Sequence, residues 1–378
     1  MDVSTRVMPV VRIAPAVRSR LLPVDWLRGL VMVLMTVDHS SAAFNSGRIF
    51  GDSATSWVPG TALPAAQFLT RWITHLCAPT FLFLAGFSLF ISVRRRLADG
   101  EPEADITRYI LARGLIIALL DPVWMVFVHR GEPVLQVLYA IGVAMMAMAF
   151  LRRLPARAIG ALGLLLIVLQ EALARSLSGL DGVPGALVVF TLSPGRVGPF
   201  PVWYPVVPWL AVMMLGWAAA DIARRDPEAF RPRLQLAAGI ALLVFAVVRG
   251  LNGYGNAGLF RNDGSFFQWI HTAKYPASLS YLACELGITW LLLAGLWTIE
   301  LPRWLGAPLT ILGQTAFFFY LLHAHLLRLS AWSLGLLHHG GLAVTYLAAA
   351  TVIAVLLPLC VRFRRYKVAH PDGLAQYI

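Results

Sequence analysis

The chain has 378 residues, of which 58% are hydrophobic and only 13% are charged. Because soluble domains carry about 25% charged residues, this composition excludes an ordinary soluble enzyme and indicates a helical membrane protein. The net charge of +12 does not indicate nucleic-acid binding, since the basic residues lie in short clusters between apolar runs.

Apolar runs of about 20 residues recur along the chain and predict about ten membrane-spanning helices. In chain order they cover 27–45, 68–92, 109–128, 134–151, 157–174, 203–222, 235–250, 276–299, 308–329 and 342–362. Basic connections such as 94–96 and 361–367 fall on the side that the positive-inside rule assigns to the cytosol. The expected fold class is therefore all-α, a polytopic membrane bundle with both termini in the cytosol.

One membrane domain fills most of the chain. We expect a basic cytosolic segment over 1–26, a transmembrane domain over 27–362 and a cytosolic tail over 363–378. The outer connections are long and rich in Gly, Pro, Asn and aromatic residues, and such irregular segments commonly hold binding sites.

The first apolar helix carries an arginine and a histidine near its two ends. Arg28 and His39 share one helix face at two depths, separated by about 16 Å along the axis. Ionisable side chains within a spanning helix cost about 2.5–3.5 kcal/mol and commonly mark a site or a pathway. In the alternative interpretation, Arg28 only anchors the cytosolic end by pairing with Asp25, and a neighbouring group satisfies His39.

Membrane topology sorts the ionisable residues into two layers. The candidates for catalysis in the outer layer are Asp38, His39, Arg71, His75 and Lys274. The candidates for binding a polyanionic ligand in the inner layer are Arg28, Arg113, Arg94, Arg95 and Arg96. Imidazole titrates near neutrality and suits proton transfer, whereas guanidinium groups bind phosphate through two parallel hydrogen bonds.

Helical geometry constrains the partners of His39. Asp38 lies about 100° away from His39 around the helix, so a partner of His39 should come from another helix. By depth, His75 and Lys274 are the best placed, although His75 is alternatively an ordinary histidine in a helix interface. Glu285 is expected on the same helix face as Lys274, as a functional carboxylate or as a hydrogen-bonded core residue.

Several catalytic signatures are absent from the sequence. No phosphate-binding GxxxxGK[ST] loop and no HExxH zinc motif is present. The three cysteines are scattered through separate apolar runs, which does not indicate a metal cluster. We therefore expect no metal.

Eight sequence blocks, spread in order along the chain, carry a family resemblance. They are VDWLRGLVMVLMTVDH at 24–39, FLTRWITHLCAPTFLFLAGFS at 68–88, VLYAIGVAMM at 137–146, YPVVPWLAVMMLGW at 204–217, RGLNGYG at 249–255, HTAKYPASLSYL at 271–282, GQTAFFFYLLHAHLL at 313–327 and CVRFRRYKVAHPD at 360–372. Together they resemble the catalytic domain of heparan-alpha-glucosaminide N-acetyltransferase and its bacterial relatives. The spacing of Arg28 and His39 is also similar to that of the wider membrane acyltransferases that modify bacterial surface glycans.

The resemblance implies acetyl transfer across a membrane from acetyl-CoA, with the inner arginines on its phosphates and its thioester near His39. In that case His39 acts as general base or as a transient acetyl carrier. Asp38 or His75 would orient His39, and Lys274 or Arg71 would stabilise the oxyanion. The family's loop histidine has no counterpart between His39 and His75, so these two residues take its place by position alone.

The resemblance and the two polar layers together predict an integral-membrane acetyltransferase. It would move an acetyl group from cytosolic acetyl-CoA to an amine or hydroxyl of an extracytoplasmic glycan or glycolipid. The expected partners are the lipid bilayer and this acceptor, with a homodimer left open and no nucleic acid, and the expected location is the bacterial cytoplasmic membrane. The competing function is a transporter of a small anionic metabolite or lipid headgroup, which broken helices and inverted repeats would favour. The sequence shows neither feature.

Overall fold

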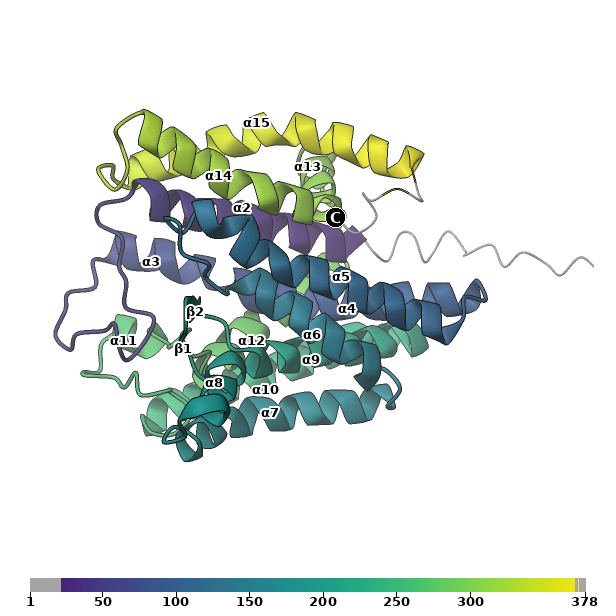
Figure 1. The fold of residues 1–378 in the computed structure, drawn as a ribbon, viewed down its shortest axis with the longest axis horizontal. Helices are drawn as coiled ribbons and strands as arrows, with labels where there is room; N and C mark the ends of the chain where they lie inside the picture. Colours follow the sequence, from purple (N-terminus) through teal and green to yellow (C-terminus); the bar gives the residue numbers. More distant parts are fainter. Residues whose placement is uncertain (1–21, 371–372, 374–378) are drawn as a thin grey trace, which may run out of the picture.

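A computed structural model describes residues 22–370 and residue 373, and it is mostly helical. The longer helices lie side by side in a bundle (Figure 1). They are α2 (Leu22–Phe44), α3 (Ala65–Thr74), α4 (Cys77–Ala98), α5 (Glu103–Val123), α6 (Val137–Leu151), α7 (Ala156–Ser176), α9 (Val206–Arg225), α10 (Pro227–Leu251), α12 (Leu279–Leu296), α13 (Arg303–Gln314), α14 (Ala316–Ser333) and α15 (Leu342–Ala369).

Shorter elements occupy the connections at one end of the bundle. They are the 3-10 helix η1 (Met125–Phe127), the helices α8 (Gly182–Thr191) and α11 (Phe266–Ile270), and the strands β1 (Gly195–Val197) and β2 (Phe200–Val202). The two strands pair antiparallel in a hairpin with Val197 opposite Phe200. Gly198 takes a φ of 56° in the turn, a backbone conformation that glycine adopts without a steric penalty.

Seven of the helical stretches in the described part of the chain are long and apolar enough to cross a membrane, and the number is eight if α13 and α14 form one bent span. The seven comprise α3 with α4, α5 with η1, α7, α9, α10, α12 and α15. This finding supports an integral membrane protein with several spans. The count of about ten and the cytosolic termini stay predictions, and residues 1–21, 371–372 and 374–378 lie outside the described part.

Helix α2 lies inside the bundle. It packs against α3, α4, α12, α13, α14 and α15, and in Figure 1 it runs in purple beneath α14 and α15. Leu27, Val31 and Met35 recur four residues apart on its buried face, which is the spacing of one side of an α-helix. The same helix therefore carries Asp38 and His39 into the interior of the protein.

Helices α4 and α9 pack closely because glycines face each other's backbone. A Cβ atom added to Gly86 would meet Met213 O at 1.9 Å, and one added to Gly216 would meet Phe83 O at 1.9 Å. Small residues permit this approach in membrane proteins, where packing rather than water drives helix association. The contact fixes α4, which lines the cavity described below.

The prediction of a single helix over 308–329 is wrong. The structure has α13 and α14 in its place, with an angle of 89° between them at Thr315. The bend exposes Gly313 O at the end of α13, and Arg28 Nη1 donates to this carbonyl over 3.1 Å. A cation at a helix C-terminus is favourable. Hydropathy along the sequence does not indicate this contact, because both halves of the segment 308–329 are apolar.

The helix predicted over 276–299 begins later than expected. Ser278 is the N-cap of α12, and its side chain accepts a hydrogen bond from Tyr281 N over 3.1 Å. Lys274 therefore lies in the preceding connection and shares no helix face with Glu285, which corrects our expectation. Glu285 itself is buried on α12, and its Oε1 has no hydrogen-bond partner among the described residues.

Candidate active site

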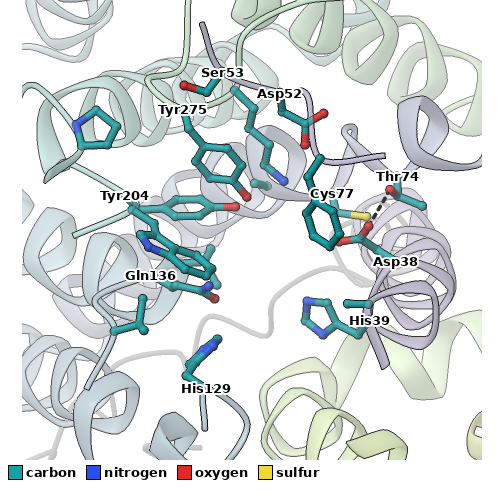
Figure 2. Close-up of a pocket in the computed structure, with 18 of the residues that line it drawn as sticks. Asp38, His39, Asp52, Ser53, Thr74, Cys77, His129, Gln136, Tyr204 and Tyr275 are labelled. Carbon is teal, nitrogen blue, oxygen red and sulfur yellow. Dashed lines mark hydrogen bonds between the residues drawn. The ribbon is translucent and has the colours of Figure 1, made fainter. Parts of the chain in front are cut away.

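A cavity of about 750 Å³ lies where the ends of α2, α3, α4 and α14 meet the long connections. The connections after α2, after η1 and before both α9 and α12 complete its wall, as Figure 2 shows for Asp52, His129, Tyr204 and Tyr275. Four of the five predicted catalytic residues line it, namely Asp38, His39, Arg71 and Lys274. This size is typical of a site for a small ligand.

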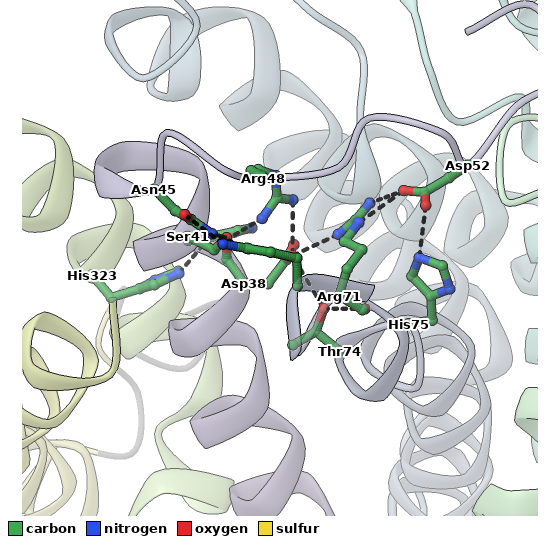
Figure 3. A network of polar contacts seen from close by, with 11 residues as sticks. Asp38, Ser41, Asn45, Arg48, Asp52, Arg71, Thr74, His75 and His323 are labelled. Carbon is green, nitrogen blue, oxygen red and sulfur yellow. Dashed lines mark hydrogen bonds and ion pairs between the residues drawn. The ribbon is translucent and has the colours of Figure 1, made fainter. Parts of the chain in front are cut away.

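Asp38 is the acceptor of three hydrogen bonds. Its Oδ1 accepts from Arg71 Nη1 over 2.5 Å, from Arg48 Nη2 over 2.9 Å and from Thr74 Oγ1 over 3.1 Å (Figure 3). Charge-assisted hydrogen bonds of this kind hold a carboxylate in its ionised form. Asp38 therefore anchors α3 and the first outer connection to α2, and no hydrogen bond joins it to His39 in the described structure.

Asp52 stands at the centre of the same network. Arg71 Nε donates to Asp52 Oδ2 over 2.8 Å, Arg71 Nη2 donates to the same oxygen, and His75 Nε2 lies 3.1 Å from Asp52 Oδ1 (Figure 3). Burial alone would raise the pKa of Asp52, but Arg71 and His75 outweigh it and hold that pKa below its usual range. The backbone N–H groups of Lys274 and Tyr275 donate to Asp52 O over 2.8 and 3.1 Å, so Asp52 also fixes the segment that carries Lys274.

His39 has a partner that the sequence analysis did not identify. Its Nδ1 lies 2.7 Å from Nε2 of His323 on α14. Nδ1 of His323 contacts the carbonyls of Phe319 and Tyr320 at 3.1 and 2.8 Å, and a carbonyl only accepts. A neutral His323 therefore carries its proton on Nδ1 and accepts at Nε2, which makes His39 Nδ1 the donor. His39 Nε2 is then unprotonated, and no described residue hydrogen-bonds it.

Lys274 places a cation in the cavity wall. The residue is 5% exposed, and its Nζ lies 5.9 and 5.4 Å from the ring centroids of Tyr204 and Tyr275. No carboxylate in the described structure lies within ion-pair distance of it. Burial and the neighbouring Tyr275 and Tyr281 raise the pKa of Tyr204, so its phenol stays protonated. This wall therefore offers hydrogen-bond donors to a ligand oxygen.

His75 does not line the cavity, and no hydrogen bond joins it to His39. Its ring is buried against Asp52, and its backbone O accepts from Tyr281 OH over 2.9 Å. Our expectation that His75 or Lys274 would be the partner of His39 is therefore wrong, because His323 from α14 occupies that position.

The inner arginines lie outside the cavity. Arg28 Nη1 lies 2.9 Å from Asp25 Oδ1, and Arg28 Nη2 donates to Ser88 Oγ over 2.7 Å, so the pairing foreseen in the alternative interpretation exists. Arg113 lies within electrostatic range of Arg28 and donates to Tyr109 OH over 3.1 Å.

The arginine run near the end of α4 contains two kinds of side chain. Arg96 forms an ion pair with Glu101 at 2.7 Å, and its guanidinium lies 3.8 Å from the ring centroid of Tyr109. Arg94 and Arg95 are exposed. The structure therefore leaves Arg113, Arg94 and Arg95 without a carboxylate partner among the described residues.

Sequence reasoning missed Asp52, Arg48 and His323 as members of the site. Asp52 and Arg48 lie in an irregular connection with no periodicity to mark them. His323 is fully buried on α14, and spacing within one helix says nothing about its contact with a residue on another helix. Within residues 22–370 and 373, no group of three or more His, Cys, Asp or Glu side chains is placed to hold a metal ion.

The chain matches a known protein family. Residues 20–254 match the family described as "Heparan-alpha-glucosaminide N-acetyltransferase, catalytic". The matched segment contains Asp38, His39, Asp52, Arg71 and His75, whereas Lys274 and His323 lie beyond it. No curated protein matches the chain. Because the match covers more than half of the sequence, the chain belongs to the family of the heparan-alpha-glucosaminide N-acetyltransferase catalytic domain.

Proposed function

We propose that the protein is an integral-membrane acetyltransferase that moves an acetyl group from acetyl-CoA to an amine or hydroxyl of an extracytoplasmic glycan or glycolipid. The family supports transfer chemistry in a membrane, and the observation that carries the proposal is the contact of His39 Nδ1 with His323 Nε2 over 2.7 Å in the wall of a cavity of about 750 Å³. The bacterial cytoplasmic membrane and a cytosolic donor are parts of this proposal.

His39 acts as the general base. The accepting amine or hydroxyl gives its proton to His39 Nε2 as its nitrogen or oxygen forms a bond to the acetyl carbonyl carbon. The imidazolium that forms keeps its second proton on Nδ1, where His323 Nε2 accepts it over 2.7 Å. His39 then returns the proton to the departing thiolate, so the acetylated acceptor and a free thiol are the products and atoms balance.

Lys274 is the donor best placed for the developing negative charge on the acetyl oxygen. It is a cation in the cavity wall without a carboxylate partner in the described structure, whereas the guanidinium of Arg71 is already bonded to Asp38 and Asp52. Preorganised donors of this kind contribute about 100-fold to 1000-fold to the rate. Arg71, Asp38 and Asp52 are positioning residues in this mechanism.

Acetyl-CoA supplies an activated acetyl thioester and several phosphates for recognition. Among the inner arginines, Arg113 fits a phosphate best, because Arg28 is bonded to Asp25 and Ser88 and Arg96 to Glu101. Arg94 and Arg95 are exposed near the C-terminal end of α4, and they suit the part of acetyl-CoA that is most exposed to solvent.

A transporter of a small anion is the second candidate. The 89° break between α13 and α14 favours it, because discontinuous helices commonly hold the substrate of secondary transporters. The break lies beside Arg28, however, and neither Gly313 nor Thr315 lines the cavity.

Transfer of radiolabelled acetyl from acetyl-CoA to amino sugars and hydroxyl-bearing glycolipids, catalysed by the purified full-length protein, tests the proposal. His39→Ala should lower kcat about 100-fold or more. His339→Ala, in an exposed residue that does not line the cavity, is the matched control and should retain full activity. Full activity of His39→Ala would refute the assigned base. No acetylated acceptor together with saturable anion uptake in proteoliposomes would favour the transporter.

A further inference from the structure

Three basic side chains lie at the rim of the cavity, apart from the network around Asp38 and Asp52. Arg130 follows η1, Arg328 is on α14, and His338 is in the connection after α14. All three line the cavity, and we call them the rim cluster. Because they come from three segments far apart in the sequence, only the fold brings them together.

Hydrogen bonds hold Arg130 and His338 of the rim cluster in place. Arg130 Nη2 lies 2.8 Å from His338 Nε2, and because a guanidinium only donates, the imidazole accepts and is neutral. Burial lowers the pKa of His338, and the charges of Arg130 and Arg328 lower it further. His338 N donates to Ala43 O over 3.0 Å, which fixes this connection to the end of α2.

The two guanidinium groups of the rim cluster have no carboxylate partner in the described structure. Three carboxylates line the cavity. Asp38 and Asp52 are bonded to Arg71, and Glu132 forms its ion pair with Arg196 at 2.9 Å. Arg130 and Arg328 therefore present uncompensated positive charge, and guanidinium groups match phosphate oxygens in geometry and charge.

Large exposed apolar side chains lie close in sequence to Arg130 and Arg328 of the rim cluster. Val123 on α5, Phe127 in η1 and Trp332 on α14 are 69%, 55% and 70% exposed. In a membrane protein such a surface faces lipid, and tryptophan is enriched at the level of the headgroups. A cluster next to such side chains is well placed to meet lipid headgroups, and the same cavity is lined by His39.

We propose that the rim cluster binds the phosphate of a membrane lipid, and that the acceptor sugar is attached to this lipid. The attachment of the acceptor sugar to this lipid rests on the proposed acetyl transfer, whereas the phosphate binding does not. Arg130 and Arg328 hold the phosphate between them, and His338 holds the Arg130 guanidinium in place.

The experiment measures binding of radiolabelled dodecyl phosphate to the full-length protein in an uncharged maltoside detergent, without acetyl-CoA. Wild type should bind saturably, and the double variant Arg130→Gln with Arg328→Gln should raise Kd about tenfold or more, since charge-assisted hydrogen bonds are lost. Arg175→Gln is the matched control, because Arg175 is exposed at the end of α7 and does not line the cavity. Its Kd should stay within about twofold of wild type, because it makes no contact with the site.

Two outcomes would overturn the inference. Equal affinity in wild type and the double variant, with both proteins unfolding at the same temperature, would refute the rim cluster as the phosphate site. Displacement by an equal concentration of inorganic phosphate would refute a lipid source and indicate a soluble phosphate ligand. Because no acetyl donor is present, inactivity of the protein as an acetyltransferase would leave this measurement unaffected.

Discussion

A hydrogen bond joins the imidazole rings of His39 on α2 and His323 on α14. The Nδ1 of His39 lies 2.7 Å from the Nε2 of His323, and the two ring planes are 12° apart. Since His323 is held by two backbone carbonyls through its other nitrogen, it fixes both the ring orientation and the tautomer of His39. His323 is therefore a positioning residue for the proposed base.

Replacing His323 separates this positioning role from a merely structural one. His323→Phe should lower kcat about tenfold to 100-fold with little change in the KM for the acceptor, because the base is misoriented while the cavity remains. His323→Gln should retain more activity, since its amide oxygen accepts the same hydrogen bond. Steady-state kinetics and the pH profile of kcat check this. Equal activity of both variants and wild type would show that the contact does not orient His39.

Arg71 should be essential for stability. It is bonded to both Asp38 and Asp52, and removal of one partner from a buried ion pair costs about 3–5 kcal/mol. We expect Arg71→Met to lower the free energy of unfolding by about that amount in a denaturant titration of the solubilised protein. Arg108→Met, which breaks the exposed pair with Asp105, should cost only about 0–1 kcal/mol. Similar losses of unfolding free energy in the two variants would contradict the assignment of Arg71 to buried ion pairs.

The close contact between α4 and α9 makes a packing prediction. Gly86→Ala should lower the unfolding temperature strongly and reduce folded yield, because the new Cβ would stand 1.9 Å from Met213 O and the helices would have to separate. Gly239→Ala on α10 is the control, since its Cβ would meet nothing within 4 Å. That change should be neutral or stabilise the helix by up to about 1 kcal/mol. Comparable folded yields of the two variants would refute this packing.

His129 should make the folded protein less stable in acid. Burial, followed by the charge of Arg328, lowers the pKa of His129 from 6.5 to about 4. Between these values the unfolded chain binds the proton more readily, so this residue lowers stability progressively as the pH falls from 6.5 to about 4. His129→Gln should flatten that part of the curve of unfolding temperature against pH. An unchanged curve would show that His129 is solvated in the folded protein.

The broad architecture was predictable from the sequence, because hydropathy is a local property. A run of about 20 apolar residues must be helical in a membrane, where no water satisfies the backbone, whatever its neighbours are. Four predicted helices, 134–151, 157–174, 203–222 and 276–299, match α6, α7, α9 and α12 to within three residues at each end. The bend at Thr315 was not predictable, since both halves of the segment are apolar and the contact of Arg28 with Gly313 O comes from another helix.

The site was predictable only in part. Asp38, His39, Arg71 and His75 were singled out because ionisable groups are costly inside apolar segments and therefore carry information. Asp52 and Arg48 lie in an irregular connection, where polar residues are ordinary and no such contrast exists. Arg130 and His338 also lie in irregular connections, whereas Arg328 is on α14, and the sequence does not show that these three residues meet.

The sequence by itself determined the membrane setting, the approximate helices, the family and which titratable residues lie in apolar surroundings. Only the tertiary structure decided that His39 pairs with His323, that Arg71 joins Asp38 to Asp52, and that Lys274 faces the cavity without a carboxylate partner in the described part of the chain. The physical reason is that burial and helicity follow from local composition. Hydrogen-bond partners depend on which residues distant in sequence the packing of α2 against α3 and α14 brings within about 3 Å.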